Sequence, residues 1–351
     1  MALPLRSATL LGVAIASALA VSAALVALTH GPSGRVVSSL YDGSLNGWGS
    51  FGYTLDATAP LLLVALGTIV AVRGGEFNIG QEGQLMMGAL AAALVAIRMP
   101  GPGPLVLVAS LFAAALGGAI WAGIAALLRF ARGVDIVIGS LLLVFVAGQL
   151  LAYALNSQWF IQEHGAGSAR QAESAQLGAG VRLPRLGAYP GANVGTGFLL
   201  ALGLAVVVAV ALARTHWGFR LRLLGLNPVA ARRAGISAAV LGSAAIAISG
   251  AFAGLAGGVM LTGTAYRLTP GFSNNVGWTG LLVALVAGND AGGAVAVALL
   301  FGALDAGGGF LSTAGIPTDL VPVVQALVVL GVVLPSTFAR RRAAPAVAAA
   351  V

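Results

Sequence analysis

The sequence predicts an all-α protein that crosses a membrane many times. Of its 351 residues, 59% are hydrophobic and 8% are charged, whereas soluble domains carry about 25% charged residues. The mean hydropathy is +0.98. Apolar runs long enough to cross a hydrocarbon layer of about 30 Å, which takes about 20 residues, recur along the whole chain. These observations favour an integral membrane protein.

We predict about ten membrane-spanning segments from these runs. They are residues 8–28, 57–72, 79–97, 104–128, 134–155, 196–213, 238–261, 272–287, 291–311 and 319–338. The second, third and eighth are short or interrupted by glycine, so the count is nine or ten. The first is read as a retained helix, and a cleaved signal peptide is the alternative because Arg6 precedes an apolar run.

The distribution of arginine predicts the orientation. All 18 basic residues are arginine, and with an internal N-terminus twelve fall on the cytoplasmic side and six outside. The positive-inside rule selects this orientation, with both termini in the cytoplasm. The net charge of +8 therefore indicates topology and not nucleic-acid binding.

A single transmembrane domain, residues 1–351, is expected to have six parts. They are a first helix with an external loop (1–56), a first block of helices (57–155), an external loop (156–195), a cytoplasmic loop (214–237), a second block (238–338) and a cytoplasmic tail (339–351). The external loop is rich in Gly, Ala, Ser and Pro, which predicts a small irregular cap.

The two blocks have the same plan and enter the membrane from opposite faces. In the first, a polar, glycine-rich stretch, "GGEFNIGQEG", interrupts the apolar pattern, and in the second "PGFSNNVGWTG" does so. Paired broken segments in an inverted repeat are typical of transporters, with the transport site near the midplane. The pattern indicates transport.

Polar side chains at these breaks are candidates for the substrate pathway, because such groups are costly in lipid. The candidates are Asn78, Gln81, Glu82, Gln84, Asn274, Asn275 and Trp278. Asn78, Gln81 and Glu82 share one face if the helix has begun by Asn78, and we expect them to be accessible to water. Close helix packing is the alternative explanation for the glycines. Asp305, alone in the ninth segment, is a weaker candidate.

Several functions are excluded by composition. Lysine is absent, so the chain has no P-loop lysine and is expected to bind no ATP itself. Cysteine is absent, and His30, His164 and His216 match no metal-ligand spacing. We expect no catalytic residue, metal or cofactor in this chain.

The cytoplasmic loop has a helix signal at Asn227 and Pro228. Asn suits a helix cap, Pro suits the first turn, and "VAARRAG" predicts one or two exposed turns that end at Gly235. Such a basic helix docks on a partner, lies on anionic headgroups, or merely follows the positive-inside rule.

The segments "RGGEFNIGQEGQLMMGA", "LGLNPVAARRAGI", "SGAFAGLAGG", "GWTGLLVALVAGND" and "LFGAL" resemble a known family. It comprises the permease subunits of bacterial ABC importers of the branched-chain amino acid and simple-sugar class. The "FNIGQEGQ" form is most similar to the nucleoside branch, which works with basic-membrane-protein lipoproteins. The resemblance covers residues 55–335.

The resemblance implies a type II importer fold in the plasma (inner) membrane. Its implied partners are a second permease in a homo- or heterodimer, an ABC ATPase subunit, and a solute-binding lipoprotein or periplasmic protein. It also implies that the cytoplasmic loop couples to the ATPase, through Gly225, Asn227, Pro228, Ala230, Ala231, Arg232, Arg233 and Gly235.

The sequence therefore predicts the permease subunit of an ATP-driven importer for nucleosides or related polar solutes. Simple sugars and branched-chain amino acids are alternative substrates. An ion-coupled secondary transporter, with Glu82 or Asp305 as coupling carboxylate, is the alternative mechanism. An intramembrane enzyme is disfavoured because no nucleophile and base stand out.

Overall fold

The computed structural model describes residues 16–17, 20–21, 24, 27, 33–157, 159–162, 172–187 and 194–333. The chain forms two compact units, one of Thr58–Ala298 and one of Met1–Ala57 with Leu299–Val351. Most of the first predicted segment, 8–28, and the tail 339–351 lie outside the described residues.

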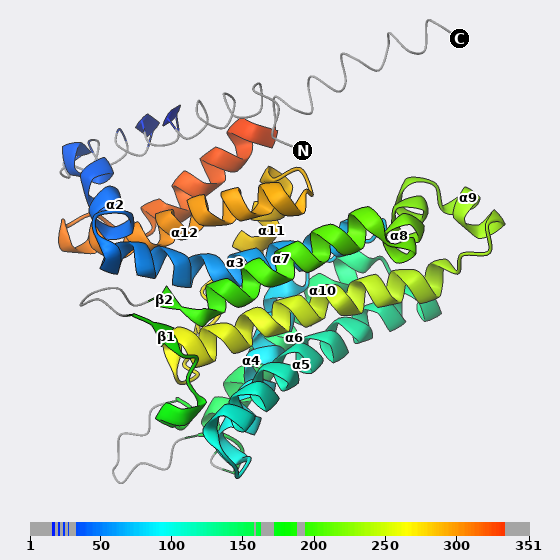
Figure 1. The fold of residues 1–351 in the computed structure, drawn as a ribbon, viewed down its shortest axis with the longest axis horizontal. Helices are drawn as coiled ribbons and strands as arrows, with labels where there is room; N and C mark the ends of the chain where they lie inside the picture. The colour runs from blue at the N-terminus through cyan, green and yellow to red at the C-terminus, as the bar shows by residue number, and fades with distance from the viewer. Residues whose placement is uncertain are drawn as a thin grey trace, which may run out of the picture. The chain divides into compact units, whose positions relative to one another are not determined.

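The unit Thr58–Ala298 is mainly helical, and the longest non-helical stretch of its described residues lies between Asn156 and Thr196 (Figure 1). Its long helices are α3 (Trp48–Arg73, which enters the unit at Thr58), α4 (Gln81–Arg98), α5 (Gly103–Arg132), α6 (Ile136–Asn156), α7 (Thr196–Arg214) and α10 (Ala238–Met260). Shorter helices are α8 (His216–Leu226), α9 (Pro228–Arg233), the π-helix Leu261–Ala265 and α11 (Val276–Val286). The helix α12 (Ala291–Thr313) begins in this unit.

Helix α4 lies at the centre of this unit, and residues on several of its faces are buried. It packs on α5, α6, α10 and α11. Small residues make this possible: a methyl group added at Gly83 would lie 2.9 Å from the Cα of Val144 on α6. Small residues at helix contacts let backbones approach closely in membrane proteins.

Helices α4, α5 and α10 meet backbone to backbone. A methyl group added at Gly88 on α4 would lie 2.2 Å from the Cα of Gly254 on α10, and one at Gly118 on α5 would lie 2.1 Å from the carbonyl oxygen of Gly250. Any side chain at these positions would push the helices apart. The contact brings α10, from the second half of the sequence, against helices of the first half (Figure 1).

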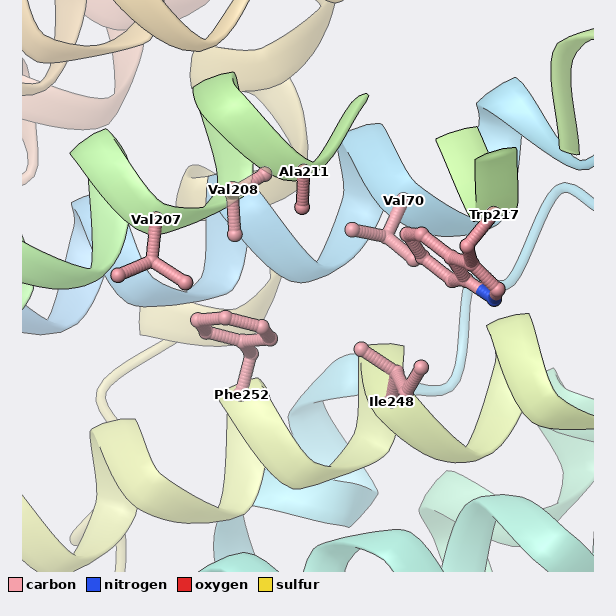
Figure 2. A pocket seen from close by; sticks show the side chains of 7 residues that line it. All are labelled: Val70, Val207, Val208, Ala211, Trp217, Ile248 and Phe252. Carbon is pink, nitrogen blue, oxygen red and sulfur yellow. The ribbon is translucent and has the colours of Figure 1, made fainter. Parts of the chain in front are cut away.

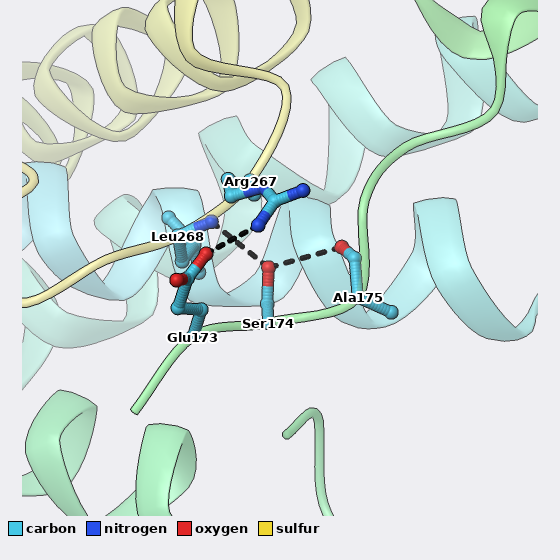
Figure 3. A network of polar contacts seen from close by, with 5 residues as sticks. All are labelled: Glu173, Ser174, Ala175, Arg267 and Leu268. Atoms are coloured by element: carbon cyan, nitrogen blue, oxygen red, sulfur yellow. Dashed lines mark hydrogen bonds and ion pairs between the residues drawn. The ribbon is translucent and has the colours of Figure 1, made fainter. Parts of the chain in front are cut away.

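The described part of the loop 156–195, which was predicted to be external, has little regular structure. It contains a 3₁₀ turn, Ala179–Val181, and two antiparallel strands of two residues, β1 (Arg185–Leu186) and β2 (Val194–Gly195). Backbone hydrogen bonds join Ser174 to Leu268 and Leu177 to Tyr266. Arg267 pairs with Glu173, and the Ser174 hydroxyl accepts from the Leu268 N–H (Figure 3). The loop is thus fastened to the chain that follows α10.

The unit of Met1–Ala57 and Leu299–Val351 contains α2 (Val36–Ser44), the start of α3, the end of α12 and a helix at Leu320–Val333. Gly43 of α2 packs on Phe310 of α12, where an added methyl group would lie 2.6 Å from the ring. Gln325 donates a hydrogen bond to Asp305, at 2.7 Å. Asp305, the weaker pathway candidate, therefore has a partner within its own unit.

Among the described residues, six helices are long and apolar enough to cross a membrane, namely α3, α5, α6, α7, α10 with its π-helical end, and α12. The apolar helices Val276–Val286 and Leu320–Val333 are shorter. An all-α polytopic protein is therefore confirmed. The prediction was wrong at two boundaries: α3 begins at Trp48 and not at residue 57, and α11 spans only Val276–Val286, within predicted segment 272–287. The boundaries were misplaced because glycine and polar residues near the start of α3 and around α11 are typical of loops. In the structure, these residues lie within or next to the helices.

Candidate functional site

The break between α3 and α4 is an ordered loop whose backbone groups have partners. Gly75 has a φ of +82°, a conformation that glycine adopts without strain. The side-chain oxygen of Asn78 accepts from the N–H of Gly80 at 3.0 Å, and the hydroxyl of Ser140 accepts from the N–H of Ile79 at 3.2 Å. Buried backbone groups outside a regular helix require such partners.

Two amides at this break form a reciprocal pair. Asn78 Nδ2 donates to Gln84 Oε1 at 2.9 Å, and Gln84 Nε2 donates to Asn78 Oδ1 at 3.1 Å. Both side chains are almost fully buried. The pair ties the last residues of the loop to the first turn of α4.

A serine of α10 joins this pair to a second amide. The hydroxyl of Ser249 accepts from Asn78 Nδ2 and from Gln81 Nε2, each at 3.2 Å, and Gln81 also donates to Thr68 of α3 at 2.6 Å. We call Thr68, Asn78, Gln81, Gln84 and Ser249 the polar cluster. All its members are buried. The cluster links α3, α4 and α10 through groups that would be costly to bury alone.

Glu82 connects the first break to the second. Its Oε2 accepts a hydrogen bond from the backbone N–H of Gly277, in the first turn of α11, at 2.7 Å. The Ser273 hydroxyl and the N–H groups of Asn275 and Trp278 also bond to this carboxylate. The first N–H groups of a helix have no partner within it, and a carboxylate there satisfies them. Glu82 therefore caps a helix 195 residues away in sequence.

The second break, between the π-helix and α11, has a strained backbone. Asn274 and Asn275 have φ angles of +43° and +60°, in the left-handed region that Asn tolerates better than most residues. Their side chains are exposed, and Trp278 is partly buried. Asn274 and Asn275 directly precede α11, and Trp278 lies in its first turn.

The structure differs from two expectations for the first break. Helix α4 begins at Gln81, so Asn78 precedes the helix and does not share a helical face with Gln81 and Glu82. Asn78, Gln81, Glu82 and Gln84 are at most 4% exposed, although access to water was expected. The physical reason is that amides, hydroxyls and N–H groups of neighbouring helices satisfy them. Their role in a pathway stays a prediction.

The loop of residues 214–237, predicted to be cytoplasmic, contains two helices, one of which was predicted. The Asn227 side chain accepts from the N–H of Ala230 at 3.0 Å and Pro228 is the first residue of α9, which confirms the cap. Gly235 follows the helix with a φ of +75°. Ala231 is buried, whereas Arg232 and Arg233 are exposed. Helix α8 was missed, because its glycines and arginines masked an apolar stripe of Trp217, Leu221 and Leu224.

Gly225 places this loop directly on the first break. A methyl group added at Gly225 would lie 2.4 Å from the carbonyl oxygen of Arg73 and 3.0 Å from the N of Gly75. One helical turn earlier, Leu221 packs against Gly74. The end of α8 and the start of the break therefore form one close contact.

Charged groups fix both ends of this contact region. Arg129 on α5 forms an ion pair with Glu76, with 3.4 Å between Nε and Oε2. Burial raises the pKa of Glu76 above its ordinary value, and the positive charge of Arg129 opposes that rise. Arg73 donates to the carbonyl oxygen of Asn289, at 2.9 Å. The segment between Arg73 and Glu76 is thereby held to α5 and to the end of α11.

Several site residues escaped sequence analysis. Thr68, Ser140, Ser249 and Ser273 read as ordinary small polar residues within apolar runs, and Gly277 as one glycine among 51. Buried amides and carboxylates need partners, but no local pattern in the sequence indicates that these residues provide them. Among the described residues, no group of three His, Asp or Glu side chains is placed to hold a metal ion.

Comparison with known proteins decides between the mechanisms left open by the sequence. The family described as "Branched-chain amino acid transport system / permease component" matches residues 50–333. The chain belongs to this family. It is therefore a multi-pass membrane permease subunit and not itself an enzyme. Membership of this family supports the ATP-driven importer over the ion-coupled secondary transporter.

Relatives of this permease subunit carry the names of two substrate classes. The chain is 36% identical to a glucose ABC transporter permease protein of Haloferax volcanii, over 83% of this chain and 78% of the relative. It is 33% identical to a guanosine ABC transporter permease protein of Bacillus subtilis, over 85% and 86%. A nucleoside ABC transporter permease protein of Lactococcus lactis is 29% identical, over 83% and 80%. No solved structure matches the permease subunit significantly.

Proposed function

We propose that this permease subunit forms part of the translocation pathway of an ATP-driven importer for nucleosides or related polar solutes, in the plasma membrane. Relatives named for guanosine and for nucleosides align over more than four-fifths of the chain. The chain's two polar breaks offer amide, hydroxyl and backbone groups, which can bond to ribose hydroxyls or base edges.

The hydrogen bond from Gly277 to Glu82 carries the proposal, because it brings together the two broken segments. In transporters built from inverted repeats, such segments meet at the substrate site. Residues 57–155 and 238–338 are proposed to be these repeats. Asn78, Gln81, Glu82, Gln84, Asn274, Asn275 and Trp278 are proposed to line the pathway once the buried groups separate. The structure described here is then the closed conformation of that site.

The loop of α8 and α9 is proposed to couple the pathway to a separate ATPase subunit. Its proposed contact residues are Gly225, Asn227, Pro228, Ala230, Ala231, Arg232, Arg233 and Gly235, with both termini of the chain also in the cytoplasm. This subunit would bind no nucleotide itself. A second permease and a solute-binding protein complete the proposed complex.

Charge reversal tests the coupling contact. Arg232→Glu with Arg233→Glu should reduce co-purification of the ATPase and uptake, while the permease still inserts in the membrane. Arg132→Glu, an exposed arginine at the end of α5, is the matched control. Unchanged co-purification and uptake would leave these arginines with a topological role alone.

Substrate choice is tested on the whole complex in proteoliposomes. Uptake of labelled guanosine, driven by internal ATP, should be inhibited by other nucleosides and not by glucose or leucine. ATP hydrolysis should rise with the nucleoside-loaded binding protein. Uptake driven by a proton or sodium gradient without ATP would refute the proposal.

Glucose or another simple sugar is the second candidate, because the relative at 36% identity is named for glucose. The same competition experiment separates the two candidates. Inhibition by glucose without inhibition by adenosine, guanosine or uridine would assign the complex to sugars.

A further inference from the structure

A wholly apolar pocket opens between α3, α7, α8 and α10. Its volume is about 210 Å³. Seven residues line it: Val70, Val207, Val208, Ala211, Trp217, Ile248 and Phe252 (Figure 2). Among these side chains, only Trp217 has a polar group, its indole N–H. That nitrogen lies on the side of the ring away from Phe252. The pocket is therefore unsuited to a nucleoside or a sugar.

Two arginines follow the pocket on the helices that line it. Val207, Ala211 and Arg214 are spaced i, i+4 and i+7, so Arg214 continues the pocket face of α7 to the end of that helix. On α8, Arg220 follows Trp217 by three residues, again on one face. Both arginines are exposed, and the described residues provide neither with an ion pair or hydrogen bond. Residues 214–237 contain no acidic side chain.

We propose that this pocket binds an acyl chain of an anionic phospholipid whose headgroup lies on Arg214 and Arg220. An apolar slot followed by one exposed arginine on each of two helices that line it complements a molecule with a hydrocarbon chain and a phosphate. Trp217 is placed as tryptophans at membrane interfaces are, with an apolar ring and one polar end. The proposal rests on the orientation proposed above, since basic residues attract anionic lipids of the cytoplasmic leaflet.

The lipid would brace the coupling loop. Trp217 forms one wall of the pocket, and Leu221, one turn further along α8, packs on Gly74 at the first break. An acyl chain against Trp217 therefore supports the same helix that contacts the break. The site would act as a lipid-dependent support for coupling, separate from the polar cluster.

Lipid retention by the purified complex tests the proposal without any transport assay. The complex is exchanged into detergent with equal amounts of phosphatidylglycerol and phosphatidylcholine of the same chains, and bound lipid is counted by native mass spectrometry. The wild-type complex should retain phosphatidylglycerol selectively. Arg214→Gln and Arg220→Gln should each weaken that retention about fivefold. Arg132→Gln, an exposed arginine at the end of α5, should not.

A second variant tests the pocket itself. Ala211→Trp fills the cavity and should abolish retention of both lipids, whereas Ala213→Trp, on an exposed face of α7, should leave it unchanged. Equal retention of the two lipids, or retention that the arginine variants leave unchanged, would overturn the proposal. So would covalent capture of a second permease by a photoreactive amino acid at Val207, because a protein would then cover the pocket. A complex that retains the lipid but transports sugar would refute only the nucleoside assignment.

Discussion

The carboxylate of Glu82 on α4 caps the first turn of α11 through the backbone N–H of Gly277, with 2.7 Å between Oε2 and N. A methyl group added at Gly277 would lie 2.6 Å from the same oxygen, so the two helix starts fit closely. One side chain thus joins the two breaks in the membrane helices. Removal of this side chain should therefore destabilise both breaks.

Glu82→Ala should destabilise the complex by about 1–3 kcal/mol, because it leaves buried N–H groups of α11 without an acceptor. Glu82→Gln keeps one acceptor oxygen for Gly277 but replaces the other by a donor, so its melting temperature should fall less than that of Glu82→Ala while uptake falls. Thermal unfolding of the purified complex and uptake in proteoliposomes provide the two measurements. Glu82→Gln with collapsed stability and normal uptake in the surviving protein would make Glu82 a structural anchor only.

Ser249 provides a test of the polar cluster. Ser249→Ala removes the oxygen that accepts from Asn78 and Gln81, and we expect a loss of about 1–3 kcal/mol. Ser110→Ala is a matched control, because the Ser110 hydroxyl is equally buried and bonds to the carbonyl of Val106 on its own helix. Equal shifts in melting temperature for the two variants would show that the cluster has no special contribution.

Gly225→Ala should impair coupling. The new methyl group would lie 2.4 Å from the carbonyl oxygen of Arg73, so α8 must move away from the first break. We expect ATP hydrolysis to continue with less solute transported per ATP. Gly203→Ala on α7, where an added methyl group meets nothing within 4 Å, should keep the wild-type ratio. A normal ratio for Gly225→Ala would exclude this contact from coupling.

Cysteine labelling tests the orientation, and the natural absence of cysteine makes a single label specific. Gln176, in the loop predicted to be external, and Ala234, after α9, are both exposed, so neither site is limited by burial. In intact cells, an impermeant maleimide should label Gln176→Cys and not Ala234→Cys. The opposite pattern would invert the proposed topology.

Local signals predicted part of this structure well. The Asn227–Pro228 pair predicted the start of α9, because a cap and a first-turn proline act within one turn of helix. The break at residues 74–80 was predicted because glycine and polar residues interrupt an apolar run. Both inferences depend only on residues adjacent in sequence.

Other features depend on residues far apart in sequence, and no local pattern encodes them. Nothing near Glu82 indicates that its partner is Gly277, and nothing near Ser249 marks it as the acceptor for two amides. The early start of α3 at Trp48 was missed for a related reason. Packing within its unit stabilises helical turns that local propensity alone leaves uncertain.

The contact of Gly88 and Gly118 with α10 has a consequence for biosynthesis. Helices α4 and α5 are synthesised well before residues 238–260. The glycine surfaces of α4 and α5 that pack on α10 therefore lack their packing partner while more than a hundred further residues are made. During the same period, the side chains of Asn78 and Gln81 lack their hydrogen-bond acceptor, the hydroxyl of Ser249. The nascent first half therefore has to be shielded in the bilayer by lipid or by the insertion machinery. Only when α10 has inserted can these glycine surfaces and amides be covered, so a chain truncated before α10 would leave them uncovered.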